Sequence, residues 1–89
     1  MKSSTYGSIA TIVFIKNKEK VCKSLDSAIK VTDNYCKKLS LNNELSYMTK
    51  YRIINELVKS NVLIDDKNKK NRKISLSNKI NDIIKWAYQ

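Results

Sequence analysis

The stretch that decides the fold is SYMTKYRIINELVKSNVLIDDKNKKNRKISLSNKI, residues 46–80. Its first half has the apolar spacing of a helix that begins after Ser46, a good N-cap residue, and ends near Asn61, which tolerates the left-handed conformation at a helix C-terminus. Two short runs of alternating apolar and polar residues follow, 62–66 and 72–76, and they predict an antiparallel hairpin. The side chains expected to face inward are Val62, Ile64, Ile74 and Leu76.

Two helices are expected before this stretch. Apolar residues at helical spacing predict an N-terminal helix from Tyr6, although its many β-branched residues leave a strand as the alternative. The positions that define this spacing are Tyr6, Ile9, Ala10, Val13 and Phe14. Residues 1–5 are polar and are expected to be disordered. A second amphipathic helix is predicted over 25–39, with Ser24 as its N-cap, and a short extra strand near Val21 stays open.

A last helix is expected after the hairpin. Ser77 would cap it, and its apolar residues have the spacing of an amphipathic helix: Ile80, Ile83, Ile84, Ala87 and Tyr88. The chain, 1–89, is then one domain with the order helix, helix, helix, strand, strand, helix. This is a mainly α fold with a small β-hairpin, the layout of a winged helix-turn-helix domain.

The composition indicates a polyanionic partner. The chain has 89 residues, with 18 Lys and Arg against 8 Asp and Glu, and its net charge is +10. Nucleic acid is the first candidate and an anionic membrane surface the second. The sequence contains no His, the commonest general base and a frequent zinc ligand, so we expect no enzyme, no metal and no other cofactor. No segment approaches the roughly 20 apolar residues that span a bilayer, and we expect a cytoplasmic protein that does not bind membranes.

The helix predicted at 46–60 has the composition of a DNA-recognition helix. Its N-terminal half carries long polar, cationic or aromatic residues and no carboxylate: Tyr47, Met48, Lys50, Tyr51, Arg52 and Asn55. A helix in the major groove presents such residues to the DNA while its other face packs on the domain. Arg52 and Asn55 are expected to lie opposite the inward Ile54 and Leu57, and therefore to contact base edges.

Four of these residues have a structural alternative. Tyr47 and Tyr51 are as well suited to packing as to contacting DNA, and Met48 is more often a filler of core gaps than a base reader. The alkyl stem of Lys50 could cover apolar surface instead of reaching DNA.

The tip of the hairpin, 66–73, is strongly basic. The residues expected to contact DNA are Lys69, Lys70, Arg72 and Lys73. They can neutralise phosphates or enter a minor groove, where the potential is most negative. The alternative is a solvated turn that aids solubility.

The two cysteines and the oligomeric state complete the expectations. Cys22 and Cys36 are expected to be reduced and partly buried, with a disulfide between them as the alternative. A homodimer is expected because two domains related by a two-fold axis read more bases than one. The candidate interface lies on the first and last helices, at Phe14, Ile84, Trp86 and Tyr88. Covering an edge of its own domain is the alternative for Trp86.

Parts of the chain resemble known winged-helix families. Asn34-Tyr-Cys-Lys-Lys-Leu-Ser-Leu41, Leu45-Ser-Tyr47 and Ile53-Ile-Asn-Glu-Leu57 together look like the C-terminal winged-helix domain of archaeal origin-recognition initiators. The run Glu56-Leu-Val-Lys-Ser-Asn-Val-Leu-Ile64 resembles the end of the recognition helix in MarR-type regulators, with Asn61 where a Gly is usual. The resemblance covers about residues 21–80. The sequence departs from these families in lacking the initiators' ATPase module and the Asp-Arg and Gly-Arg patterns of their wings.

The resemblance implies a sequence-specific double-stranded DNA-binding protein. A small transcriptional regulator that acts as a homodimer is the leading interpretation, and an archaeal virus or plasmid is the expected source. One alternative is a DNA-binding accessory protein in replication or plasmid maintenance. An alternative of another class is a winged-helix module whose hairpin binds an acidic protein.

Overall fold

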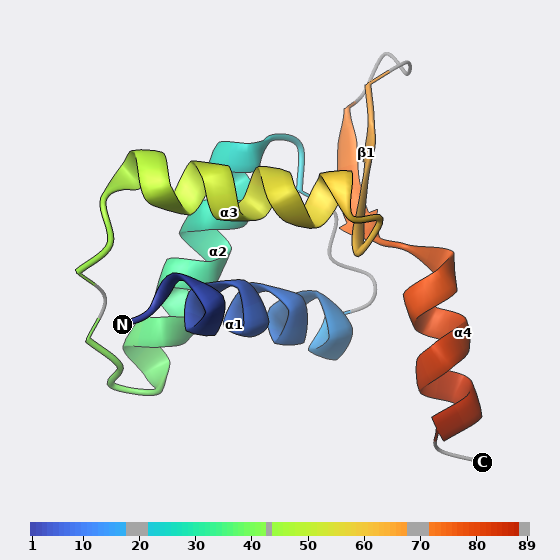
Figure 1. Cartoon of the computed structure of the whole chain (residues 1–89), viewed down its shortest axis with the longest axis horizontal. Coiled ribbons are helices and arrows are strands. Elements are labelled where there is room, and N and C mark those ends of the chain that lie inside the picture. Colours follow the sequence, from blue (N-terminus) through green and yellow to red (C-terminus); the bar gives the residue numbers. More distant parts are fainter. Residues whose placement is uncertain (18–21, 43, 68–71, 88–89) are drawn as a thin grey trace.

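The helices and strands occur in the predicted order. The computed structural model describes residues 1–17, 22–42, 44–67 and 72–87. Its elements are α1 (Ser3–Lys16), α2 (Leu25–Lys38), α3 (Tyr47–Lys59), β1 (Leu63–Asp66), β2 (Lys73–Leu76) and α4 (Asn78–Ala87). The predicted mainly α fold with a small antiparallel hairpin is therefore confirmed (Figure 1).

The core lies between α1, α2 and α3, and the hairpin closes one end of it. The apolar stripe expected on α1 is buried in full: Tyr6, Ile9, Ala10, Val13 and Phe14. The other helices and the hairpin complete the core with Cys22, Leu25, Ala28, Ile29, Cys36, Ile54, Leu63, Ile74 and Leu76. Helix α1 is thus the centre of the domain, because it contacts both other helices of the body and also β2.

Helix α1 begins at Ser3, earlier than expected. Part of the segment 1–5, which was expected to be disordered, is therefore helical. Met1 packs against the core, and the backbone N–H of Tyr6 donates to the carbonyl of Lys2 at 3.1 Å. The polar composition concealed this start because the anchoring apolar residue lies before the helix and not in its first turn.

Local capping signals set the ends of α2 and α3. The hydroxyl oxygens of Ser24 and Ser46 accept from the backbone N–H groups of Ser27 and Thr49, as predicted for N-caps. Asn61 has a φ of 62°, so it ends α3 in the left-handed conformation that its position predicted. The N–H of the next residue, Val62, reaches back to the carbonyl of Leu57 at 3.0 Å, which completes a Schellman motif.

The end of α2 has the same geometry without an Asn or a Gly. Ser40 has a φ of 55°, and its N–H donates to the carbonyl of Lys37 at 3.0 Å. The N–H of Leu41 donates to the carbonyl of Cys36 at 2.9 Å. The sequence did not predict this second left-handed position, because Ser seldom adopts it.

The facing of β1 differs from the prediction by one residue. Leu63 is buried and pairs with Leu76, whereas Ile64 pairs with Ser75 and is 43% exposed. The Schellman motif occupies Val62, so the strand starts one position later than expected. Successive strand residues point to opposite sides, and this shift therefore reverses which residues of β1 face inward. On β2, the inward facing of Ile74 and Leu76 is confirmed.

The chain around the first cysteine joins the hairpin by a single bridge. Cys22 and Ile74 exchange two backbone hydrogen bonds of 2.7 and 3.1 Å. The extra strand considered near Val21 is thus reduced to this bridge in the part of the chain that the structure describes, which does not include Val21 itself. Cys22 and Cys36 are both buried, more fully than expected, and no disulfide joins them in the structure.

The hairpin and α4 extend from the body in opposite directions. Figure 1 shows the hairpin rising past α3, while α4 leaves the base of the hairpin and runs away from it. Ser77 makes the connection: its N–H donates to the carbonyl of Val62 at 3.0 Å, and its hydroxyl oxygen accepts from the N–H of Ile80 at 3.2 Å. The predicted cap at Ser77 is therefore confirmed.

Candidate nucleic-acid interface

Helix α3 turns one face into the body and the other to solvent. Ile54 is fully buried and Leu57 packs against the core, so the inward face is the predicted one. The outward face holds five of the predicted contact residues together: Tyr47, Met48, Tyr51, Arg52 and the half-buried Asn55. Met48 is 68% exposed and fills no gap in the core.

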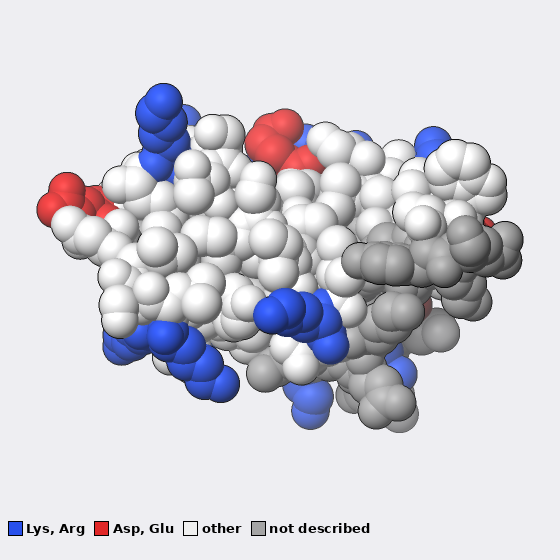
Figure 2. All heavy atoms as spheres, turned by 90° about the horizontal axis from the view of Figure 1, so that it is seen from below, with Lys and Arg blue, Asp and Glu red and all other residues white. Residues whose placement is uncertain are grey.

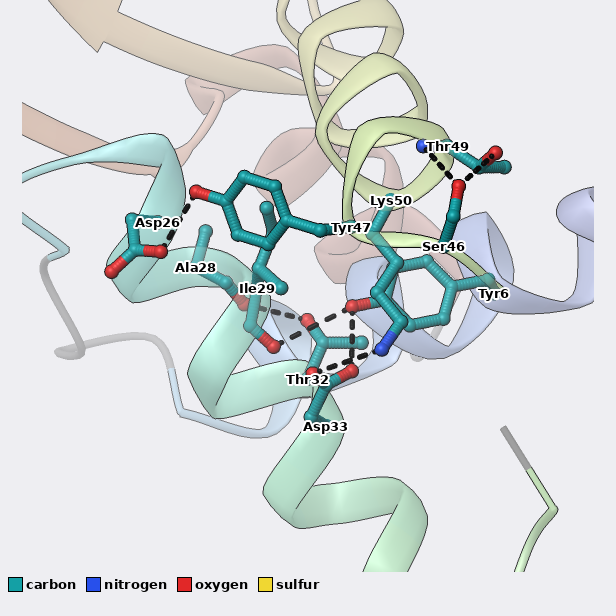
Figure 3. A network of polar contacts seen from close by, with 10 residues as sticks. All are labelled: Tyr6, Asp26, Ala28, Ile29, Thr32, Asp33, Ser46, Tyr47, Thr49 and Lys50. Carbon is teal, nitrogen blue, oxygen red and sulfur yellow. Dashed lines mark hydrogen bonds and ion pairs between the residues drawn. The ribbon is translucent and has the colours of Figure 1, made fainter. Parts of the chain in front are cut away.

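Two carboxylates of α2 hold the start of α3 in place. The hydroxyl of Tyr47 donates to Asp26 Oδ1 at 2.8 Å, and the amine of Lys50 donates to Asp33 Oδ2 at 3.2 Å (Figure 3). Asp26 and Asp33 are seven residues apart and share one face of α2, just as Tyr47 and Lys50 share one face of α3. The seven-residue spacing of Asp26 and Asp33 is a signal in the sequence for an acidic face on α2, but it does not identify the residues of α3 that this face meets.

Lys50 therefore points inward, and the structure separates it from the other predicted DNA contacts. Its side chain is 14% exposed, and its amine lies 5.9 Å from the centre of the Tyr6 ring. The hydroxyl of Tyr6 donates to the second oxygen of Asp33 at 2.9 Å, so the carboxylate is shared between a phenol and an ammonium group (Figure 3). Burial, followed by the hydrogen bond to Asp33, raises the pKa of Tyr6 well above its ordinary value. Of the two interpretations of Lys50, contact with DNA or packing against the domain, its position agrees with the second, and its amine pairs with Asp33.

Tyr47 has a mixed position. Its ring remains half exposed and lies 6.4 Å from the ring of Tyr51, with a tilt of 38° between the two planes. Its hydroxyl group is committed to Asp26, and this bond raises the pKa of Tyr47 and lowers that of Asp26. Tyr47 can therefore offer a ring face or edge to a ligand, while its phenol serves the fold.

The hairpin contains an ion pair that the sequence analysis did not anticipate. Arg72 donates from Nε to Asp65 Oδ1 at 2.9 Å and from a terminal nitrogen to Oδ2 at 2.6 Å. The side chain of Asp65 is 3% exposed, and the hydrogen bond from Arg72 lowers its pKa. Asp65 pairs with Ile74 across the hairpin, and Arg72 lies two residues before Ile74 on the same face. Arg72 was predicted as a phosphate contact, but its guanidinium instead links the two strands of the hairpin through Asp65.

The remaining predicted hairpin contacts are at its tip and on β2. Lys73 is exposed at the start of β2, and Lys67, which was not among the predicted contacts, is exposed directly after β1. Lys69 and Lys70 lie outside the residues that the structure describes. Among the described residues of α3 and the hairpin, the exposed cationic side chains are Arg52, Lys59, Lys67 and Lys73.

Comparisons with family models, curated proteins and solved structures found no match for this chain. Within the described ranges, no helix is long and apolar enough to cross a membrane. Among the same residues, no three His, Cys, Asp or Glu side chains come together as a metal site requires.

The residues predicted for a dimer interface differ in whether they are exposed. Phe14 is buried in the core of its own domain, so its assignment to an interface is wrong. It belongs to the inward stripe of α1, and no second copy can reach it. Trp86, by contrast, is 77% exposed on α4. The Ile84 side chain and Tyr88 lie outside what the structure describes.

Proposed function

We propose that this chain is a sequence-specific double-stranded DNA-binding protein, a small transcriptional regulator that binds as a homodimer. Helix α3 would enter the major groove, and the hairpin tip would meet the backbone or a minor groove. Such a protein works where its DNA is, in the cytoplasm of the archaeal host of a virus or plasmid.

One observation carries this proposal. The outward face of α3 has no carboxylate from Tyr47 to Asn55. The two carboxylates of α2 that lie near it, Asp26 and Asp33, are bonded to side chains of α3. A face that approaches phosphates must be free of negative charge, while a solvated helix face usually mixes both signs. The hairpin, which contacts α3 through β1, adds two further exposed lysines, Lys67 and Lys73.

The contacts divide into base readers and backbone contacts. Arg52 and Asn55 project from the outward face and can form bidentate hydrogen bonds with guanine and adenine, respectively. Met48 and Tyr51 offer apolar surface of the kind that contacts a thymine methyl group. Lys73 and the lysines of the hairpin tip would meet phosphate. Lys50 and Arg72 leave this set, since their charged groups are already paired within the domain.

A binding selection on random duplex DNA tests the proposal. A palindromic consensus supports the homodimeric regulator, and a preference for repeats or AT-rich DNA would support an accessory role in replication. No enrichment at all would refute DNA recognition and favour the protein-interaction module.

A salt titration then separates the roles of the two elements. Asn55→Ala should cost roughly 1–3 kcal/mol on the selected duplex and little on a scrambled one. Lys67→Ala together with Lys73→Ala should weaken binding to both duplexes alike and reduce the slope of log K against log salt by up to about 2. If the lysine variant loses specificity and Asn55→Ala does not, the hairpin reads the sequence and the roles are reversed.

A further inference from the structure

Helix α4 presents large apolar side chains that its own domain leaves uncovered. Ile80 packs against the core, but farther along the helix Ile83 is half exposed and Trp86 is 77% exposed. The helix cannot fold back to cover them. Ser77 is the single residue between β2 and α4, it is buried, and its N–H and hydroxyl are bonded to Val62 and to the first turn of α4.

The body of the domain has an apolar groove of about 470 Å³ between α1 and α3. Its walls are Ser4, Gly7, Ser8 and Thr11 of α1 and Ile53 and Leu57 of α3. Gly7 lets the helices approach closely here, since a Cβ atom at this position would lie 3.3 Å from Ile53. The small residues of α1 leave room that no side chain of this domain fills among the residues described.

The surface around this groove differs from the rest of this strongly basic chain. Helix α1 has no charged residue before its last position, Lys16. Seen from the side of α1, a broad uncharged area lies across the molecule, with Lys and Arg below it and at the edges, and Asp and Glu at its upper and left margins (Figure 2). The edge of the groove on α3 carries one charge of each sign, Arg52 and Glu56. Among the α4 side chains that the structure describes, the charged ones are Lys79 and Asp82, and both are exposed.

We infer that the groove between α1 and α3 receives helix α4 of a second copy of the chain, with Ile83 and Trp86 inserted into it. The chain supplies both halves of the contact: large apolar side chains on α4, and small side chains in the groove. The short, hydrogen-bonded connection at Ser77 directs α4 away from its own groove, so the helix that docks comes from another copy.

The exchange is reciprocal. A ten-residue helix is about 15 Å long, and one such helix buries less than the roughly 1,200–2,000 Å² of a stable interface. Two helices in two grooves double that area, and a two-fold axis gives this closed arrangement without further contacts. The inference rests on the proposed homodimer, and Arg52 at the edge of the groove is also one of the proposed DNA contacts.

The test uses Trp86, the single tryptophan of the chain, as a probe in the absence of DNA. As the protein concentration rises into the high micromolar range, sedimentation equilibrium should show a dimer, and Trp86 emission should move to shorter wavelength over the same range. Ser8→Lys places a charge in the groove and should weaken the dimer roughly tenfold or more, because the partner helix would bury that charge. Thr5→Lys adds the same charge to an exposed position of α1 outside the groove, and should dimerise like the unchanged protein.

A second pair of variants tests the other half of the contact. Ile83→Asn should also dissociate the dimer, whereas Asp82→Asn on the neighbouring exposed position should affect it far less. Circular dichroism checks that all four variants are folded. A monomer at high micromolar concentration, or a dimer that Ser8→Lys leaves intact, would overturn the inference. An assembly larger than a dimer would overturn reciprocal exchange. None of these results bears on whether the protein binds DNA.

Discussion

Replacing Lys50 with Met separates a structural role for this residue from a role in DNA binding. The substitution keeps an unbranched apolar stem and removes the ammonium group that lies 3.2 Å from Asp33. The Lys50 side chain is 14% exposed and that of Asp33 is 29% exposed, so water screens this pair less than a surface pair. Asp33 would keep its bond from Tyr6 but lose its cation. We therefore expect the free energy of unfolding to fall by about 1–2 kcal/mol, between the values for exposed and fully buried pairs.

Urea denaturation followed by circular dichroism measures this loss. With a slope of about 1 kcal/mol per molar, typical of a small domain, the midpoint should fall by about 1–2 M while the slope stays constant. Lys30→Met is the matched control, because Lys30 pairs with Asp26 at the same distance of 3.2 Å but is 75% exposed. The control should leave the midpoint nearly unchanged. If Lys50→Met left the midpoint unchanged and instead made the salt dependence of DNA binding shallower by about 0.9, Lys50 would be a phosphate contact and its assignment to the interior would be refuted.

Three further substitutions test the buried Ile54 and the two ionisable side chains Tyr6 and Asp65. Ile54→Ala should cost about 2–5 kcal/mol in urea denaturation, because Ile54 is fully buried under α3, and a smaller loss would mean that the groove or α1 collapses onto the gap. Tyr6 has a pKa raised above its unfolded value, so its contribution is complete below about pH 10 and is lost as the pH rises further; Tyr6→Phe should lower stability at neutral pH and flatten the alkaline decline. Asp65 has a lowered pKa, so its contribution is present above about pH 4 and is lost as the pH falls through the folded value; Asp65→Asn should flatten the acid decline, and an unchanged profile would show that Arg72 does not stabilise the carboxylate.

Features that depend on neighbouring residues were predictable from the sequence. Ser24, Ser46 and Ser77 cap the helices that they were expected to cap, and Asn61 ends α3. The inward stripe of α1 was also predicted, because helical periodicity needs no knowledge of the partner surface. Such signals determine where a helix begins, where it ends and which side of it is buried.

Features that depend on pairing between distant segments were not predictable in the same way. The facing of β1 changed because one residue, Val62, closes the preceding helix, and a shift of one position exchanges Leu63 and Ile64. Basic residues could be recognised as candidates for DNA contacts, but their partners could not. Lys50 meets Asp33, and Arg72 meets Asp65, only after the chain has folded.

The anchoring of α3 leaves its outward face open to change. Tyr47 and Lys50 fix the start of the helix to two carboxylates of α2, while Ile54 fixes its middle in the core. Together these points set both the rotation of the helix about its axis and its position along it. Met48 and Asn55 project from the opposite side and take no part in that anchoring, so substitutions there alter surface chemistry at constant orientation. Under the proposed DNA-binding function, single substitutions at Met48 or Asn55 would change specificity with little change in the stability of the domain.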